Sequence, residues 1–530
     1  MGIKRYIADA DTTITNAFRH DLREGNRATG SNMGASDVME VFSVFGQGPP
    51  GQYTDASSGS VELSRALIKF PISEVSTDRT NSVIPGSGSV QFYLRMYNAK
   101  HSFTLPVSST VSVVPVSQSW EEGTGLDMEE YSDKTRDGAG TCWVNKSSGS
   151  AWDTKGGQFH SGTNSNYTAH FANGEEDVEI DISQVVEDWI AGTKDNYGLG
   201  VFLTSSLEGY FSSSTSATTA SVLHNLAGTT TSYYTKKFFS RSSEYFFKRP
   251  CIEARWYSAK KDDRGNTFVS SSLVTNAENI NTVFLYNNVR GQLRNLPDVG
   301  TDGAVIFVQL YTSASNGELI KNSSPYNIRQ TGALGDKPPQ HALTGGYVST
   351  GIYSCSFAVN TTASILYDRW FSGSTAGVDI ESATIYYTGS VTMNQFSSSA
   401  DNFNPNPKYA TKITNLKDTY SRNEIPRFRV FVREKDWSPN IYTVATKNIK
   451  SSIVNKAYFK IIQISDDSTI IPFGTGSVTE YTGLSYDSKG NYFDLDMDLL
   501  ETGYAYGIKL AYYINGAYHE QSEVFKFRVE

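Results

Sequence analysis

Cysteines and long apolar runs are scarce in this chain of 530 residues, and each scarcity excludes a class of protein. The three cysteines, Cys142, Cys251 and Cys355, are odd in number and far apart, which fits neither a disulfide framework nor the ligand spacing of a zinc site. No run of about 18 apolar residues exists to form a membrane-spanning helix. We therefore expect a protein without membrane insertion, stabilised by hydrophobic cores and by partners.

Charged residues and histidines are also few. Asp, Glu, Lys and Arg make up 19% of the chain, and the formal net charge of -9 would repel a phosphate backbone, so we expect no nucleic-acid partner. The seven histidines form no His-Glu-x-x-His pair, and neither a phosphate-binding loop nor a Gly-x-Ser-x-Gly turn before a helix is found. These absences favour a protein that is not an enzyme, with no cofactor and no catalytic or metal site.

Aromatic residues, in contrast, are abundant at 13%, and they stand among many Ser, Thr, Gly and Asn residues. One short helix is predicted between a capping Asp181 and a terminating Gly192, with an apolar stripe from Val185 to Ile190. Elsewhere apolar and polar residues alternate, which is typical of half-buried strands, most clearly at 90–96, 178–182, 427–433 and 525–530. The fold class indicated is all-β.

Two stretches rich in charged or turn-forming residues suggest domain boundaries, one after Trp256 and one at 397–408. The predicted domains are 1–257, 258–400 and 401–530. The last two share a Thr-Gly pair and a tyrosine before a late apolar strand, at 350–353 and 502–506. This pattern is typical of the tyrosine corner of immunoglobulin-like sandwiches, so we expect two smaller sandwiches of that type.

A series of short motifs runs through the first predicted domain. It includes Ala-Asp-Ala-Asp-Thr-Thr-Ile at 8–14, Ser-Trp-Glu-Glu-Gly at 119–123, Val-Val-Glu-Asp-Trp-Ile-Ala-Gly at 185–192, Phe-Ser-Arg at 239–241 and Arg-Pro at 249–250. In this order the motifs resemble the DNRLRE-type domain, a jelly-roll β-sandwich related to carbohydrate-binding modules. The family-motif residues that we single out are Trp120, Glu121, Gly123, Trp152, Trp189, Gly192, Asn196, Tyr197, Gly198, Arg249 and Pro250.

We expect these family-motif residues to build the scaffold rather than a site, because buried tryptophans supply apolar area and glycines allow tight turns. The chain departs from the family pattern by insertions at 125–140 and 204–232. Carbohydrate binding, which occurs in some relatives, would need exposed aromatic residues, for which Tyr131, Tyr167 and Tyr210 are the candidates.

The whole chain, from Met-Gly-Ile-Lys-Arg-Tyr at its start to 504–510 near its end, resembles virion structural proteins of tailed phages, particularly marine ones. Its N-terminal segment lacks the continuous apolar stretch of a secretion signal, which accords with phage parts that fold in the host cytoplasm. The resemblance implies a place in the virion, other virion proteins as partners and assembly as a homo-oligomer.

Two groups of carboxylates invite a different interpretation. Asp494, Asp496 and Asp498 would share one face of a strand and offer oxygen ligands to Ca²⁺, although a solvated face is the favoured explanation. The second group would suit a pair of carboxylates for glycoside hydrolysis. It comprises Glu121, Glu122, Asp127, Glu129, Glu130 and Asp133.

Three functions therefore stay open. The leading hypothesis is a non-enzymatic virion structural protein of the tail, neck or capsid exterior. The alternative is an adhesin or fibre component that binds a host-surface polysaccharide. The third is a polysaccharide-degrading enzyme, which no constellation of residues in the sequence demands.

Overall fold

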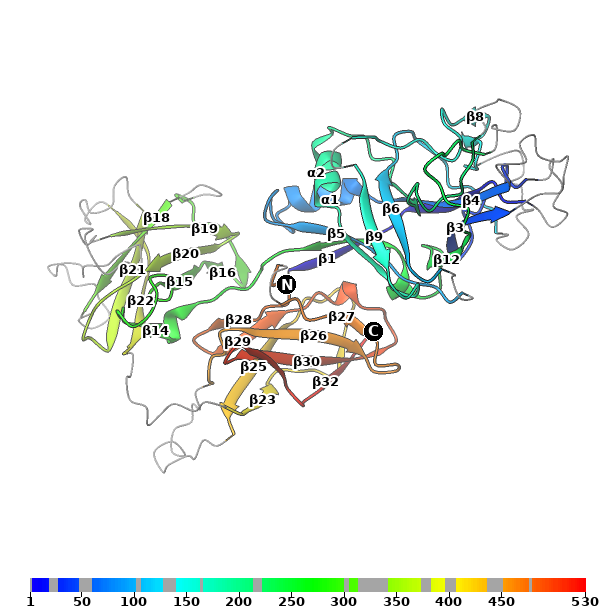
Figure 1. Cartoon of the computed structure of the whole chain (residues 1–530). Coiled ribbons are helices and arrows are strands. Elements are labelled where there is room, and N and C mark those ends of the chain that lie inside the picture. Colours follow the sequence, from blue (N-terminus) through cyan, green and yellow to red (C-terminus); the bar gives the residue numbers. More distant parts are fainter. Residues whose placement is uncertain are drawn as a thin grey trace. The chain divides into compact units, whose positions relative to one another are not determined.

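The computed structural model of the chain is all-β, with 46% strand and 7% helix, as predicted from the composition (Figure 1). The chain divides into two compact units, which we call the first unit (Gly2–Tyr257) and the second unit (Ser258–Glu530). The structure describes residues 2–18, 27–46, 60–101, 106–126, 140–162, 165–212, 222–299, 305–312, 342–372, 383–395, 407–435, 451–475 and 479–530.

The first unit is a β-sandwich of two sheets. The four-stranded sheet has the order β1 (Ile3–Ile7), β13 (Cys251–Arg255), β5 (Gln91–Met96) and β10 (Val178–Asp181). The seven-stranded sheet has the order β12 (Tyr233–Phe239), β3 (Val38–Gly46), β4 (Ser60–Lys69), β11 (Leu199–Leu203), β6 (Ser109–Pro115) and β9 (Tyr167–Phe171), and β2 (Ala10–Thr15) also pairs with β4. A small hairpin joins β7 (Asn145–Ser147) to β8 (Ser150–Ala151).

The main core of this unit lies between the two sheets. Phe92 and Leu94 of β5 and Ile68 of β4 are fully buried there because alternate residues of each strand point inward. A second core, on the other side of the seven-stranded sheet, contains Trp143 and Trp152. The seven-stranded sheet is therefore apolar on both faces.

Two helices belong to the first unit, α1 (Ile72–Thr80) and α2 (Ser183–Ala191), and a 3-10 turn, η3 (Phe246–Lys248), precedes β13. The two helices lie against each other at one end of the sandwich (Figure 1). The predicted helix is confirmed as α2, which ends at Gly192 in the left-handed conformation, with φ of 71°, but its N-cap is Ile182 and not the predicted Asp181. Helix α1 was not predicted, because its sequence Ile-Ser-Glu-Val-Ser-Thr-Asp-Arg-Thr has only two buried apolar residues and several poor helix formers.

The outer face of the four-stranded sheet carries a buried ion network, which we call the Glu253 network. Glu253 is fully buried and its carboxylate accepts hydrogen bonds from Arg5 Nε at 2.7 Å and from Arg255 Nε at 2.6 Å. Arg255 and Arg95 also pair with Glu179, at 2.8 and 2.7 Å. Although burial alone would raise it, the pKa of Glu253 is lowered to about 2 by the surrounding guanidinium groups.

The second unit begins with η4 (Asp263–Gly265) and a seven-stranded sheet, here called the central sheet. Its order is β14 (Thr267–Phe268), β22 (Thr384–Asn394), β21 (Ile365–Ser372), β18 (Val305–Tyr311), β19 (Leu343–Ser349), β20 (Ile352–Phe357) and β15 (Asn281–Tyr286). A hairpin of β16 (Asn288–Val289) and β17 (Gln292–Leu293) follows β15. One face of the central sheet packs around the buried Trp370, Tyr353 and Val308.

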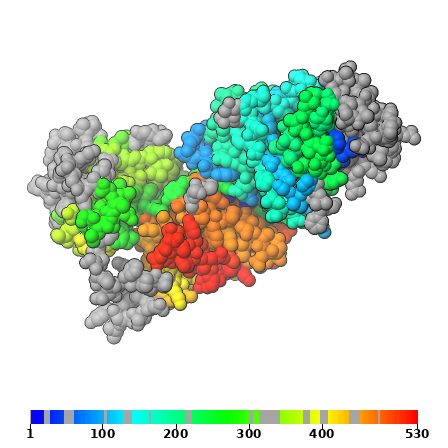
Figure 2. All heavy atoms as spheres, viewed as in Figure 1, coloured from blue at the N-terminus to red at the C-terminus, as the bar shows by residue number. Residues whose placement is uncertain are grey.

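Two further sheets, here called the C-terminal sheets, complete the second unit. One has the order β23 (Tyr409–Ile413), β25 (Arg427–Glu434), β29 (Gly490–Asp494) and β28 (Ser485–Asp487). The other has the order β24 (Thr419–Tyr420), β32 (Phe525–Val529), β30 (Ala505–Ile514), β26 (Ala457–Gln463) and β27 (Thr469–Ile471), and β31 (Ala517–Glu520) also pairs with β30. Figure 2 shows the orange and red segments that carry β26, β30 and β31 next to each other on the surface.

Aromatic rings join the two C-terminal sheets. Phe493 of β29 stacks on Phe459 of β26 with ring centroids 4.5 Å apart, and Phe428 of β25 lies 6.1 Å from Phe527 of β32. The hydroxyl of Tyr506 donates to the carbonyl of Glu501, in the turn before β30, at 2.7 Å. In the central sheet, the hydroxyl of Tyr353 accepts from the distant Leu296 N–H instead.

The four predicted strands are confirmed as β5, β10, β25 and β32. The three cysteines are free and buried. Burial raises the pKa of Cys251 to about 11 and that of Cys355 to about 12. No helix among the described residues is long and apolar enough to span a membrane.

Candidate functional site

The family-motif tryptophans lie in the scaffold of the first unit. Trp120 Nε1 donates to the carbonyl of Tyr197 at 2.8 Å, which joins two of the motifs. Trp152 Nε1 donates to the carbonyl of Cys142 at 3.0 Å inside the second core. The indole N–H groups of these two tryptophans are therefore bonded inside the protein, whereas that of Trp189 is buried without a hydrogen-bond partner in the described segments.

The other polar motif residues are also engaged internally. Asn196 Nδ2 donates to the carbonyl of Phe70 at 2.7 Å, and its Oδ1 accepts from the N–H of Gly198 at 3.2 Å. Arg249 Nε donates to the carbonyl of Ser243 at 2.9 Å, and the carbonyl of Pro250 accepts from the N–H of Ala8 at 2.9 Å. These bonds hold loops against strands.

Gly123 and its neighbours surround a residue that the sequence did not reveal, Asn32. This fully buried side chain donates to the carbonyls of Glu122 and Thr141, at 2.9 and 2.8 Å, and accepts the N–H of Gly125 at 3.0 Å. A Cβ on Gly123 would lie 2.1 Å from Asn32 Nδ2, so only glycine fits there. Apart from the N–H of Gly34, which donates to Asn32 Oδ1 at 3.1 Å, the partners of Asn32 come from segments some 90 residues or more away, so no local pattern reveals its role.

Three motifs meet at a network of Asp11, Glu122 and Arg241. The N–H of Asp11 donates to Glu122 Oε1 at 2.8 Å, the N–H of Arg241 donates to Asp11 Oδ2 at 2.6 Å, and the Arg241 guanidinium binds both oxygens of Glu122. Burial, and secondarily the charge of Glu122, raises the pKa of Asp11 to about 7. Glu121, the predicted motif residue, instead makes a long 3.4 Å bond to the N–H of Ser148.

The acidic groups considered at the sequence level are not assembled as sites in the described chain. Glu122 is bound by Arg241, and the remaining members Asp127, Glu129, Glu130 and Asp133 lie outside the described residues, as does Tyr131. Tyr167 and Tyr210 are half-buried.

The placement of Asp494, Asp496 and Asp498 on one strand face is wrong. Strand β29 ends at Asp494, and the 3-10 turn η6 (Met497–Leu499) follows, with Asp496 capping it through a 3.0 Å bond from the N–H of Asp498. Asp494 pairs with Arg427 at 2.8 Å and Asp498 with Arg422 at 2.9 Å. No three His, Cys, Asp or Glu side chains in the described segments are grouped so that they could hold a metal ion.

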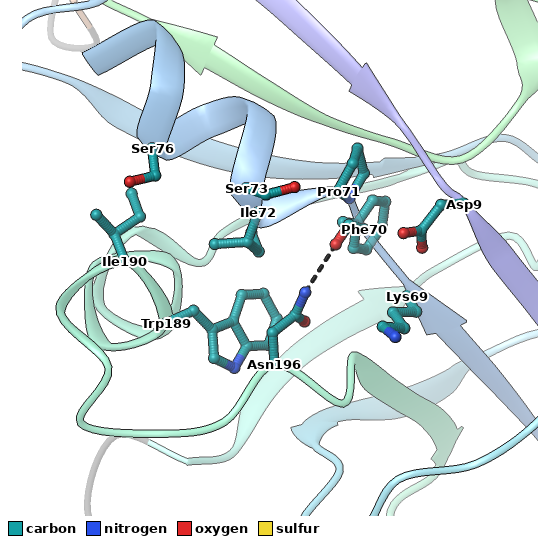
Figure 3. A pocket seen from close by; sticks show the side chains of 10 residues that line it. All are labelled: Asp9, Lys69, Phe70, Pro71, Ile72, Ser73, Ser76, Trp189, Ile190 and Asn196. Atoms are coloured by element: carbon teal, nitrogen blue, oxygen red, sulfur yellow. Dashed lines mark hydrogen bonds between the residues drawn. The ribbon is translucent and has the colours of Figure 1, made fainter. Parts of the chain in front are cut away.

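A pocket of about 430 Å³ opens between α1 and α2 of the first unit (Figure 3), and we call it the helix pocket. This volume is within the range of small-ligand sites. The loop before β2, the end of β4, both helices and the loop after α2 contribute to its wall. It is lined by Asp9, Lys69, Phe70, Pro71, Ile72, Ser73, Ser76, Trp189, Ile190 and Asn196.

The lining combines apolar and polar groups. Trp189 and Ile72 are nearly buried and form the apolar part, while Asn196 stands beside the indole and is fixed by its bond to Phe70 (Figure 3). The side chains of Asp9 and Lys69 make no hydrogen bond or ion pair with another residue of the described segments. The pocket thus offers an ammonium and a carboxylate beside an apolar wall. Trp189 and Asn196 were predicted as motif residues, but their place in a pocket was not.

No family model matches the chain, and no curated protein matches it. Fifteen chains of solved structures show similarity, among them the native conformation of E. coli alpha-2-macroglobulin solved by cryo-electron microscopy. That structure is 8% identical, and the match covers 88% of this chain and 21% of the macroglobulin, with a TM-score of 0.15. The chain therefore spans about one fifth of that protein's length, and so low a TM-score carries no conclusion about fold or function.

Proposed function

We propose that this chain is a non-enzymatic structural protein of a tailed-phage virion, a component of the tail, neck or capsid exterior that acts through protein-protein interfaces. Its partners are other virion proteins and further copies of itself. In this proposal the first unit is a DNRLRE-like jelly-roll sandwich, and 258–400 and 401–530 are immunoglobulin-like sandwiches.

The observation that carries the proposal is how the polar motif residues are used. Trp120, Trp152, Asn196 and Arg249 each donate a side-chain hydrogen bond to a backbone carbonyl of the same unit. The Arg241 guanidinium and the Glu122 carboxylate bind each other. A set of motifs that holds loops in place, rather than presenting reactive groups, supports a role for rigid shape.

An apolar patch on the central sheet supports a role for interfaces. Val305, Val348 and Ile385 are 47%, 42% and 43% exposed, and the strand registers place Val305 and Ile385 on the outward face of the sheet. The rings of Phe307 and Phe371 lie on the same face, with centroids 5.8 Å apart, and both are buried. Exposed apolar side chains gathered in this way are typical of protein-protein contacts.

The proposal is tested on purified phage particles. Mass spectrometry of washed particles is expected to find the chain at a fixed ratio to the major capsid protein, and immunogold labelling is expected to mark one station of the particle. Particles without the chain, together with purified protein that sediments only as a monomer, would refute the proposal.

Substitution of the apolar patch tests the interface directly. Val305→Asp and Ile385→Asp are expected to shift sedimentation of the purified protein toward the monomer, because a charge in the contact must be desolvated. Leu273→Asp is the matched control, since Leu273 is 78% exposed and lies on no strand of the central sheet. An equal effect of all three variants would argue against the patch.

A second function, an adhesin for host-surface polysaccharide, is favoured by the helix pocket. Lys69, Asp9, Ser73 and Ser76 provide hydrogen-bonding groups for hydroxyls or a carboxylate beside the apolar wall of Trp189. A glycan array is the test, with Lys69→Ala and Asp9→Ala expected to remove the signal and the exposed Lys100→Ala to keep it. An array on which the wild-type protein is silent would exclude this function and leave the structural role untouched.

A further inference from the structure

The segment that connects the two units, residues 258–265, pairs with the edge of a C-terminal sheet. The N–H of Asp262 donates to the carbonyl of Tyr486 at 3.0 Å, and the N–H of Tyr486 donates to the carbonyl of Lys260 at 3.0 Å. This is a parallel bridge between Lys261 and Tyr486 of β28, the edge strand of its sheet. The N–H of Lys260 donates in addition to Ser485 Oγ at 2.9 Å. The connecting segment thus extends that sheet at β28.

Asp263, one residue further on, joins the two parts of the second unit through a single carboxylate. Its Oδ1 accepts the hydroxyl of Tyr486 at 2.8 Å, and its Oδ2 accepts the N–H of Thr282 in β15 of the central sheet at 2.7 Å. Asp263 therefore touches an edge strand of the central sheet and an edge strand of a C-terminal sheet at once.

Arg264 fixes the same segment to the central sheet. Its guanidinium binds both oxygens of Asp368 in β21, each at 2.7 Å, and Asp368 is fully buried and also accepts Trp370 Nε1 at 2.7 Å. Bidentate guanidinium-carboxylate pairs are among the strongest side-chain contacts. Gly265 then passes so close to the C-terminal part that a Cβ would lie 2.8 Å from Ser488 Cα.

We propose that residues 260–265 form a latch that ties the central sheet and the C-terminal sheets into one mechanical body, with Asp263 as the shared contact. The latch is also the covalent connection to the first unit. Tension applied to the chain at Tyr257 therefore reaches the β28 pairing and the Arg264–Asp368 ion pair before the rest of the second unit. The proposal is independent of the virion role.

Lysine-specific proteolysis of the intact protein tests the latch, because Lys260 and Lys261 lie within the paired segment. Cleavage after these lysines requires the pairing with β28 to open. Asp263→Ala removes two hydrogen bonds to a charged acceptor, so we expect cleavage there to be about tenfold faster than in the wild type. Tyr486→Phe removes only the hydroxyl bond and is expected to give a smaller acceleration, and Asp153→Ala, an exposed carboxylate of the first unit, is expected to give none.

Hydrogen exchange and calorimetry give the same test without a protease. The amides of Asp262 and Tyr486 are expected to exchange faster in both latch variants. If the latch holds the two parts together, we expect the second unit to unfold in one calorimetric transition in the wild type and in two in Asp263→Ala. If Asp263→Ala does not fold, the exchange and cleavage rates of Tyr486→Phe test the latch instead. Cleavage and exchange at wild-type rates in a folded latch variant would overturn the proposal.

Discussion

At the scale of single residues, Glu253 is a fully buried carboxylate surrounded by three guanidinium groups. Glu253→Gln would leave Arg5 and Arg255 facing a neutral group at a buried position. We expect it to lower the free energy of unfolding by about 3 kcal/mol at pH 7, because breaking one partner of a buried ion pair leaves an uncompensated charge. Urea unfolding followed by circular dichroism measures this, with the exposed Glu244→Gln as control.

The same carboxylate predicts a pH dependence. Its folded pKa of about 2 lies below the unfolded value of 4.5, so the stability it contributes is present above pH 4.5 and is lost as the pH falls toward 2. The difference in unfolding free energy between wild type and Glu253→Gln is therefore expected to shrink across that window. A difference that stays constant from pH 7 to pH 2.5 would contradict this assignment.

Asn32 is the second residue whose side chain decides stability. Asn32→Asp keeps the shape but removes the donor that serves the carbonyls of Glu122 and Thr141. We expect a loss of about 2 to 4 kcal/mol in unfolding free energy, since two buried acceptors lose their partner and a charge is buried. The exposed Asn173→Asp is the control in the same urea titration, and an equal loss there would show that Asn32 has no special role.

These residues also show why the candidate site was harder to predict from the sequence than the fold was. Trp120 and Trp152 were predicted as scaffold because large aromatic side chains favour burial, and their indole N–H groups donate to backbone carbonyls. Asn32 and the Asp11–Arg241 contact depend on pairings over 90 and 230 positions, which no local pattern encodes. The helix pocket likewise needs α1, whose sequence is a weak helix former.

At the scale of secondary-structure elements, the predictions succeeded where the local sequence carried a clear signal of a strand or of a helix end. Strict alternation identified β5 and β25, and Gly192 marked the end of α2. The same alternation failed after Asp494, because Asp496 caps a 3-10 turn and ends the strand although the apolar residues continue at every second position. The hydrogen bond from the N–H of Asp498 to the Asp496 side chain therefore favours a turn there, although the alternation of apolar residues predicts a strand.

Alanine substitutions at two glycines distinguish the free-energy cost of a left-handed backbone from the cost of a steric clash. At Gly192 nothing lies within 4 Å of an added Cβ, so Gly192→Ala is expected to cost about 1 kcal/mol, from the left-handed conformation of the α2 cap alone. Gly123→Ala must also displace Asn32, and we expect a cost at least twice as large. Urea midpoints of the two variants give the comparison, and equal costs would show that the Asn32 side chain can move away freely.

At the scale of the whole molecule, the chain joins two compact units through the short segment after Tyr257. Composition predicted several β domains, and a charged, turn-rich stretch after Trp256 predicted a domain boundary there. The sequence did not reveal that Lys260–Gly265 pairs with β28, because the partner strand is more than 220 residues away. The division of the second unit at 258–400 and 401–530 stays a prediction.

The three buried thiols can report on the unfolding of each unit. Cys142 and Cys251 lie in the first unit and Cys355 in the second, all three buried with pKa values raised by burial, so a thiol reagent reaches each only when its surroundings open. In native buffer we expect no labelling by an aromatic disulfide, and in rising urea two equivalents from one unit and one from the other. Mass spectrometry of the labelled peptides would then rank the two units by stability in the intact chain, without any engineered probe.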